Sequence, residues 1–590
     1  MDISKAYQAS LLAQMAYADG LLPGMTGDDL SDQLHQKLST KGVTQSQANY
    51  FSLRYRVIYQ EPTTINGFSG TLFQDIATGD YFFSLRGTDA DGPDWKDANL
   101  DNLLSGVSRN QVVDMLNFYL RLTQTGAVNQ YKYEEVTSVL PPSSPYIVVD
   151  AGSGVAPIPT YGVLTIDSTV TGLGIIDDAT PLVVTGHSLG GHLASAFSLL
   201  FPSVSTETYT FNSAGFIGWG DNEFDGFSQL VSASVSDVAI NPLAFSTGLN
   251  SVFDVSSGMD VVSGLWGQDH LGNSFEVWAE STETNLTLDD IEFNHAIDRL
   301  SDSLAVINFL NTLDRTLTID NANTILALSS NVISTSLESL MNHLANFFNQ
   351  PSIPITDSDH NAIYSIINDI VDGLNGTTLK IETISANISE LAAQDTEAGR
   401  GYRYALVNLL PFAITSNLAG TAADDTEYDL YDGSGERLYS DEYLSDKAEM
   451  LHVLLERNRD DIPSTQNANP ELSDRFYWDY NTTTLLATGS ASTDDLGLGV
   501  EQYHFGSDNS ESLLGDVKDD HLYGMGGNDT LSGHGGNDYL EGGTGDDTIT
   551  GGTGADTLIG GAGKDTFIFN SGDGFDIIKG GDVGGDRILL

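Results

Sequence analysis

A nine-residue period near the C-terminus constrains the fold of this chain more than any other feature. Aspartate recurs at every ninth position, and an aliphatic or aromatic residue lies two positions after each aspartate. The aspartates are Asp520, Asp529, Asp538, Asp547, Asp556 and Asp565, and the apolar residues are Leu522, Leu531, Leu540, Ile549, Leu558 and Phe567. Glycines fill the preceding positions, as in Gly551-Gly552-Thr553-Gly554. This pattern predicts short strands, each with one buried side chain, joined by tight glycine turns and stacked as a parallel β-roll.

The repeat resembles G-G-x-G-x-D-x-U-x, the nonapeptide of RTX (hemolysin-type) proteins. The resemblance implies several structural Ca²⁺ ions, held by the six aspartates and by glycine carbonyls. The carbonyls expected to take part are those of Gly524, Gly526, Gly533, Gly535, Gly542, Gly545, Gly551 and Gly554. Calcium prefers such oxygen ligands. Without the ion, stacked carboxylates repel and the small core cannot offset chain entropy, so we expect calcium-dependent folding.

Charge and composition limit which partners the protein can bind and how it can be stabilised and exported. The 590 residues include 24 Lys and Arg against 82 Asp and Glu, a net charge of −58, which argues against a nucleic-acid partner. The absence of cysteine leaves no disulfide and no thiolate zinc site. The N-terminus, MDISKAYQAS, lacks the basic and apolar regions of a Sec signal. RTX proteins use type I secretion, so the resemblance implies an extracellular protein that meets the type I secretion machinery.

A second informative segment, Pro181 to Leu200, has the pattern of a strand, a tight turn and a helix. Leu182 to Val184 predict a buried parallel strand, and Leu193 to Leu200 predict an apolar helix. The turn between them, Gly186-His187-Ser188-Leu189-Gly190, is a G-x-S-x-G sequence. A serine on such a corner projects its hydroxyl above the sheet, so Ser188 is the candidate nucleophile and the Leu189 amide a candidate oxyanion donor.

An earlier strand end supplies the second oxyanion candidate. Residues 70–76 and 81–86 predict a strand pair, and the second strand runs into Gly87 and Thr88. On this fold a second oxyanion donor comes from an earlier strand-end loop, which points to Thr88. Residues 207–211 predict the next parallel strand, so strand, helix and strand at this spacing are expected to form a βαβ unit.

The acid and the base are expected in the chain order Ser, Asp, His. Two histidines remain plausible as the base, His270 and His295. We prefer His295, because a base at the edge of a loop and an apolar helix can reach the serine. Asp260 is the preferred acid, with Asp254 as its rival.

Taken together, Leu85-Arg86-Gly87-Thr88, Gly186-His187-Ser188-Leu189-Gly190 and Asp260-Val261-Val262 resemble the class 3 (fungal-type) lipase family. The resemblance covers about residues 1–300. It implies an α/β-hydrolase that cleaves lipid esters with Ser188, Asp260 and His295, with Thr88 as oxyanion residue. His270-Leu271-Gly272 resembles a family block between acid and base, which favours a structural role for His270. The Asp260 block has Ser263 where the family commonly has proline.

We therefore expect a secreted serine ester hydrolase of the triacylglycerol lipase type, with no cofactor in the chemistry. Phospholipase A1 is the alternative within the enzyme class, and a calcium-dependent surface or adhesion protein with an inactive hydrolase domain is the alternative outside it. The expected domains are residues 1–300 (hydrolase), 301–400 (helical extension), 401–505 (small mixed domain) and 506–590 (calcium-binding β-roll).

Overall fold

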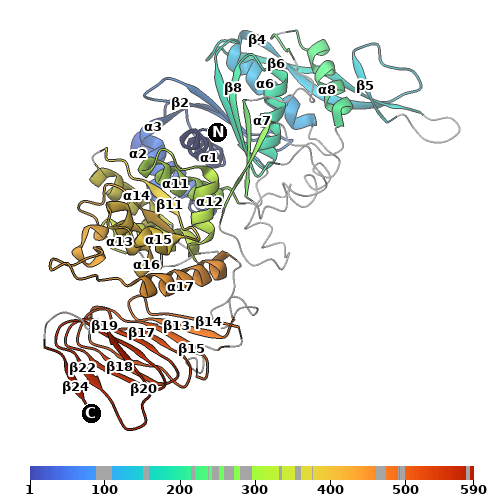
Figure 1. The fold of residues 1–590 in the computed structure, drawn as a ribbon. Helices are drawn as coiled ribbons and strands as arrows, with labels where there is room; N and C mark the ends of the chain where they lie inside the picture. Colours follow the sequence, from blue (N-terminus) through green and yellow to red (C-terminus); the bar gives the residue numbers. More distant parts are fainter. Residues whose placement is uncertain are drawn as a thin grey trace. The chain divides into compact units, whose positions relative to one another are not determined.

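The chain forms two compact units in the computed structural model (Figure 1). One unit comprises Met1–Asn308 and Asp359–Ser365, and the other comprises Phe309–Ser358 and Ile366–Leu590. The finer division into four domains stays a prediction. The structure describes residues 1–87, 109–150, 158–213, 220–236, 238–241, 251–257, 272–279, 296–330, 335–352, 360–374, 376–459, 473–489, 491, 498–579 and 585–590.

A seven-stranded sheet forms the centre of the first unit, in the order β1-β2-β3-β7-β8-β9-β10. The strands are β1 (Tyr55–Glu61), β2 (Gly70–Asp75), β3 (Tyr81–Leu85), β7 (Leu182–His187), β8 (Ser205–Phe211), β9 (Val252–Ser257) and β10 (Asn273–Val277). The first three pair antiparallel, and β3, β7, β8, β9 and β10 pair parallel. The carboxyl ends of the parallel strands therefore meet at one edge. The α/β architecture expected from the sequence is confirmed.

Helices cover both faces of this sheet. Those of the first unit are α1 (Ile3–Met15), α2 (Gly27–Leu38), η1 (Ser39–Lys41), α3 (Gln45–Arg54), α6 (Arg109–Thr123), α7 (Leu189–Leu200) and α8 (Gly220–Ser234). In β7, Thr185 donates a hydrogen bond to the Ala9 carbonyl of α1, whereas Val184 lies in the apolar core with α6 and α7. Successive strand residues point to opposite faces, so α1 covers one face and α6 and α7 cover the other.

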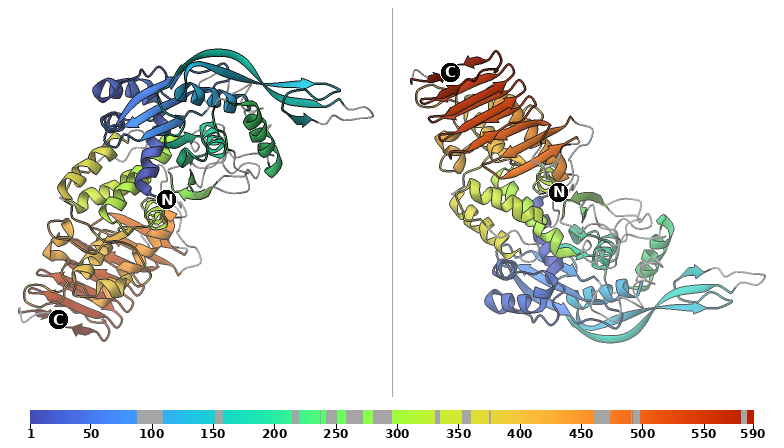
Figure 2. Two further views of the ribbon diagram at one scale, coloured as in Figure 1. Left: turned by 90° about the horizontal axis from the view of Figure 1, so that it is seen from above. Right: turned by 90° about the horizontal axis from the view of Figure 1, so that it is seen from below.

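A separate three-stranded antiparallel sheet is inserted between α6 and β7. Its order is β4-β6-β5, with β4 (Thr125–Thr137), β5 (Tyr146–Asp150) and β6 (Thr160–Leu173). Figure 2 shows these strands extending away from the rest of the first unit. Tyr131, Tyr133 and Leu164 anchor the base of the sheet in the core that contains α6 and α7.

The second unit contains a helical part and a β-roll. α11 (Ile297–Leu313) and α14 (Asn361–Leu374) contribute residues to both units. The helical part further contains α12 (Ile319–Ala327), α13 (Ser336–Phe347), β11 (Ile381–Thr383), α15 (Ile388–Ala392), α16 (Glu397–Val407), β12 (Phe412–Ile414), η5 (Ala422–Asp424), η6 (Thr426–Tyr428) and α17 (Asp441–Arg459). The buried Arg403 guanidinium donates to the carbonyls of Ala392, Gln394 and Tyr428, which joins α15, α16 and η6.

The β-roll consists of two sheets between which the chain alternates. One has the order β14-β13-β15-β17-β19-β21-β23 and the other β16-β18-β20-β22-β24. The strands are β13 (Arg475–Asp479), β14 (Thr484–Thr488), β15 (Glu501–Phe505), β16 (Ser512–Leu514), β17 (His521–Tyr523), β18 (Thr530–Gly535), β19 (Tyr539–Thr544), β20 (Thr548–Thr553), β21 (Thr557–Ala562), β22 (Thr566–Ile568), β23 (Ile577–Lys579) and β24 (Arg587–Leu589).

One apolar side chain per repeat builds the interior of the roll. Leu522 pairs with Leu540 and Leu540 with Leu558, and in the other sheet Leu531 pairs with Ile549. All are buried in a single core. Two nonapeptides therefore make one turn, and residues 18 positions apart stack. The β-roll predicted from the nine-residue period is confirmed.

Helix α17 covers the outer face of the first roll sheet. Asp446 accepts hydrogen bonds from Tyr523 and the His521 ring. Lys447 forms a fully buried ion pair with Asp479, at 2.9 Å. Strands β13 and β15 precede the repeats in the chain, and β15 pairs with β17, the first strand of the repeats in this sheet. The roll therefore begins upstream of the first nonapeptide.

None of the helices in the described part of the chain has the length and apolar character needed to span a lipid bilayer.

Candidate functional site

Ser188 occupies the corner between β7 and α7. Its backbone has φ 57° and ψ −125°, a conformation that non-glycine residues rarely adopt. The Ser188 amide donates to the Phe211 carbonyl of β8 at 2.9 Å, and its own carbonyl accepts from the Gly191 amide at 3.0 Å. Such backbone costs about 1–3 kcal/mol and persists only where the surroundings enforce it, typically at functional sites.

Close backbone approaches explain the glycines around Ser188. A Cβ on Gly190 would lie 2.1 Å from the Leu85 carbonyl oxygen of β3, and one on Gly186 would lie 2.2 Å from the Gly190 oxygen. A side chain at either position would therefore force β3, β7 and the start of α7 apart.

The end of β3 lies directly against the candidate nucleophile. A Cβ on Gly87 would meet the Ser188 Cβ at 3.2 Å and the His187 carbonyl oxygen at 2.5 Å. The preceding Arg86 is buried and donates to Asp19 and Thr63, at 2.7 and 2.8 Å. These bonds hold the end of β3 in place. Thr88, the candidate oxyanion residue, follows two positions later and lies outside the described residues.

Leu189 is the first residue of α7 and is buried. The first amides of a helix have no partner within the helix, and the helix dipole places positive potential at this end. The arrangement can therefore stabilise negative charge that develops next to Ser188.

The structure describes one of the candidate acids. Asp254 lies in β9, is 4% exposed and accepts a hydrogen bond from Thr210 of the neighbouring β8 at 2.6 Å. Asp260, His270 and His295 lie outside the described residues, so their roles stay predictions.

Described histidines in the first unit have other partners. The His187 Nδ1 lies 2.8 Å from the Tyr17 hydroxyl of the loop after α1. His360 is buried with Nδ1 2.5 Å from Asp302 and Nε2 3.2 Å from the Arg299 guanidinium. An arginine donor at Nε2 and a carboxylate at Nδ1 engage both ring nitrogens, so His360 is unsuited to accept a proton from a serine.

The repeat aspartates form two hydrogen-bonded ladders in the roll. The Asp520 amide donates to Asp538 Oδ1 and the Asp538 amide to Asp556 Oδ1, both at 2.9 Å. In the other ladder the Asp529 amide donates to Asp547 and the Asp547 amide to Asp565, at 2.8 and 3.0 Å. Each of these bonds joins two aspartates that lie 18 residues apart, on adjacent turns of the roll, and it occupies one oxygen of the accepting carboxylate.

The second carboxylate oxygen points into a glycine turn. Oδ2 of Asp529, Asp538, Asp547 and Asp556 is buried and has no hydrogen-bond partner. A Cβ on Gly533 would lie 2.1 Å from Asp538 Oδ2, and Gly524, Gly542 and Gly551 approach their own aspartates in the same way. Gly526, Gly535, Gly545 and Gly554 instead stack against turns 18 residues away.

Orphaned carboxylate oxygens beside glycine backbone fit a hard cation such as Ca²⁺. Among the described residues no three His, Cys, Asp or Glu side chains converge on one point, so an ion bound here would need backbone carbonyls as further ligands. Burial raises the pKa of Asp520, Asp529 and Asp538 to about 7 and that of Asp547 to about 6. A bound cation would offset the cost of ionising these carboxyls.

Sequence reasoning missed two members of the ladders. The Asp556 amide donates to Asp576 and the Asp565 amide to Asp586, where the spacing widens to 20 and 21 residues. The signal was present, since Asp576 and Asp586 precede Ile578 and Ile588 by the same two positions as in the repeats.

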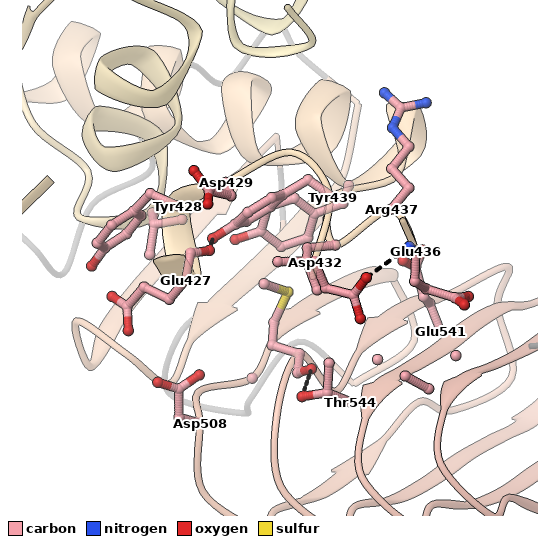
Figure 3. A pocket seen from close by; sticks show the side chains of 18 of the residues that line it. Glu427, Tyr428, Asp429, Asp432, Glu436, Arg437, Tyr439, Asp508, Glu541 and Thr544 are labelled. Carbon is pink, nitrogen blue, oxygen red and sulfur yellow. Dashed lines mark hydrogen bonds between the residues drawn. The ribbon is translucent and has the colours of Figure 1, made fainter. Parts of the chain in front are cut away.

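A cavity of about 530 Å³ lies in the second unit, between the segment 425–443 and the roll (Figure 3). Its carboxylates include Glu427, Asp429, Asp432 and Asp508, and its described lining contains no histidine. Asp432 accepts from the Glu436 amide at 2.8 Å. The described lining therefore lacks the histidine base of a Ser-His-Asp triad and carries more carboxylates than cationic side chains.

Residues 505–540 and 541–576 match the family model of the RTX calcium-binding nonapeptide repeat (4 copies). The RTX repeats predicted from the period are confirmed in this part of the chain. A search of the curated proteins found no match to the chain.

Three solved lipases are similar to this chain. Lip2 lipase from Yarrowia lipolytica is 17% identical over 48% of this chain and 81% of its own, with a TM-score of 0.21. The lipase from Rhizopus microsporus var. chinensis is 15% identical over 50% and 85%, with a TM-score of 0.24. Extracellular lipase LipA from Serratia marcescens is 13% identical over 100% and 86%, with a TM-score of 0.21. Scores this low carry no functional assignment, which rests on the residues of this chain.

The Ser188 corner predicts the effect of a single methyl group. Gly190→Ala places a Cβ against the Leu85 carbonyl, so it should destabilise the first unit by about 1–3 kcal/mol and lower ester hydrolysis at least tenfold. Gly226→Ala in α8 is the matched control, because the nearest atom to its Cβ is at 3.7 Å. Denaturant unfolding and hydrolysis of a soluble ester measure both effects. Equal behaviour of the two variants would contradict the geometry.

The raised pKa values of the repeat carboxyls predict how pH affects the ion-free roll. A carboxyl whose folded pKa lies above its unfolded value of about 3.9 stabilises the fold at low pH and loses that contribution as pH rises through the folded pKa. With a calcium chelator, amides of residues 515–570 should therefore be more protected from hydrogen exchange at pH 5 than at pH 8. Millimolar Ca²⁺ should remove the difference. Greater protection at pH 8 in chelator would contradict the assignment.

Proposed function

We propose that the chain is a secreted serine ester hydrolase that acts on lipids, of the triacylglycerol lipase type. The observation that carries the proposal is Ser188, held at a rare backbone conformation at the carboxyl end of β7 and the N-terminus of α7. A serine hydroxyl next to the first amides of a helix is the combination that acyl transfer requires, which supports the proposal.

In the proposed reaction the base accepts the Ser188 proton while the hydroxyl oxygen attacks the ester carbonyl. The Leu189 amide and Thr88 stabilise the tetrahedral oxyanion. Collapse releases the alcohol, which takes the proton from the base, and leaves the acyl group on Ser188. Water, deprotonated by the same base, then releases the fatty acid and restores the serine.

His295 is the proposed base and Asp260 the acid that orients it. Asp254 remains a rival for the acid, supported by its buried position on β9 beside Thr210. His270 remains the rival base. Exchange of each residue by a neutral one of similar size distinguishes them.

Calcium has a structural role in this proposal. Several ions held by the repeat carboxylates and glycine carbonyls would relieve the repulsion in the two aspartate ladders and complete the roll. Folding is then coupled to calcium, so the roll stays unfolded where the ion is scarce and folds outside the cell. This suits export through a type I secretion machinery.

The proposal predicts that Ser188→Ala lowers hydrolysis of triolein by at least about a thousandfold in millimolar Ca²⁺, because the nucleophile is lost. Ser195→Ala, which removes a buried hydroxyl from the same helix, is the control and should retain activity. Measuring fatty-acid release from triolein and from phosphatidylcholine in parallel decides between lipase and phospholipase A1.

In the same assay Asp260→Asn and His295→Gln should lose most activity, and Asp254→Asn and His270→Gln should lose less. The reverse order would reassign the acid or the base. If wild type and Ser188→Ala were equally inert with a calcium-folded roll, the enzyme would be ruled out and a surface or adhesion protein favoured.

A further inference from the structure

The three-stranded sheet of the first unit carries an almost uncharged segment in a strongly acidic chain. Between Val136 and Ile166 the only charged residue is Asp150, whereas the whole chain has a net charge of −58. The segment contains the end of β4, the loop to β5, β5 itself and the first part of β6. Loops of a soluble protein are normally polar, so this composition requires an explanation.

Large apolar side chains gather at the outer end of this sheet. We define the apolar tip as Val136, Val139, Leu140, Tyr146, Val148 and Ile158. Their side chains are between 40% and 75% exposed. Isolated exposed apolar residues are common, but a contiguous group marks a binding surface.

Strand register places the tip residues of β4 and β5 on one face. Val136 and Val148 both pair with Tyr161 of β6, and Tyr146 pairs with Val163. Tyr146 also contacts the Tyr161 ring edge-on, with centroids 5.0 Å apart. Directly paired residues share a face, so these side chains form a continuous apolar surface.

The exposed residues of this surface lie on the side of the sheet opposite α8, where Tyr161 and Val163 of the central strand β6 are buried. Tyr133, on the alternate set of β4 residues, packs against Phe227 of α8 with ring centroids 6.0 Å apart. Val136 therefore points to the opposite side. Toward the base of the same face Lys132 and Glu134 form an ion pair at 3.0 Å, which ends the apolar surface.

Contacts through α6 connect the base of the sheet to α7, the helix that follows Ser188. The Asn117 side chain of α6 bonds both the amide and the carbonyl of Tyr131, each at 2.8 Å. Tyr119 of α6 packs edge-on against Phe197 of α7, with centroids 5.1 Å apart. Docking at the tip would therefore act on the part of the first unit that contains Ser188.

We propose that the apolar tip inserts into an electrically neutral lipid–water interface and so anchors the first unit to its substrate. This inference rests on the proposed lipid hydrolysis. An uncharged tip suits an uncharged surface, because burial of its aliphatic groups requires no charge to be desolvated. A chain of charge −58 is repelled by anionic lipid, so affinity must come from apolar burial.

The test measures binding separately from catalysis. Ser188→Ala protein in millimolar Ca²⁺ is floated with triolein droplets coated with phosphatidylcholine. Adding Val139→Ser and Leu140→Ser should lower the bound-to-free ratio at least about tenfold. Adding Ile65→Ser, a fully exposed apolar residue outside the sheet, is the control and should leave the ratio unchanged. Thermal unfolding should coincide for all three proteins, because exposed loop side chains contribute little to stability.

Lipid charge provides the second arm. Replacing part of the phosphatidylcholine with phosphatidylglycerol should weaken binding at low salt, and added salt should restore it. Unchanged flotation of the Val139/Leu140 variant, or binding that requires anionic lipid, would overturn the proposal. A third result would also overturn it: the Ser188→Ala protein does not float and sediments as a dimer, and Val139→Ser with Leu140→Ser dissociates that dimer. The tip would then bind a second copy of the chain.

The two proposals fail in distinguishable ways. If wild type hydrolyses no ester while flotation still depends on Val139 and Leu140, the proposed function fails and the docking surface stands. If wild type hydrolyses triolein while flotation is insensitive to these residues, only the docking surface fails.

Discussion

The close approach of β3, β7 and α7 at Ser188 is the constraint on which the candidate active site depends. The Gly190 position leaves no room for a side chain beside the Leu85 carbonyl, and this contact fixes where α7 begins. Because α7 begins there, Ser188 is forced to φ 57° with its amide bonded to Phe211 of β8. The core of α6, α7 and the sheet supplies the stability that offsets this strain.

In the β-roll of the second unit, apolar burial is opposed by repulsion between carboxyl groups. The roll buries one apolar side chain per repeat, while the aspartates bring carboxyl groups together in two ladders. So small a core is opposed by the repulsion and burial of those carboxyls, and the calcium ions that we propose would stabilise the roll by offsetting both. The buried Lys447 to Asp479 ion pair and the aromatic cover of α17 add interactions at one sheet that need no ion.

The parts of the structure that were predictable from sequence are those in which each residue's surroundings are set by its neighbours in the chain. The roll repeats one local rule, and it holds even where Met525 and His534 take positive φ in place of glycine. The corner at Ser188 is equally local. The cover of the roll by α17 and the apolar tip were not predictable, because exposed Val148 and buried Val163 look alike in sequence. The acid and base depend on contacts across the chain, and sequence order alone left Asp254 and His270 as rivals.

Covalent trapping measures directly whether Ser188 is a nucleophile. The full chain, folded in millimolar Ca²⁺, is treated with a long-chain alkyl phosphonate ester and digested for peptide mass spectrometry. We expect one phosphonyl adduct, on Ser188, formed at a rate far above that of the buried Ser195 and Ser198 on the helix that follows. No adduct on Ser188, or an adduct on another serine that accounts for lost hydrolysis, would contradict it.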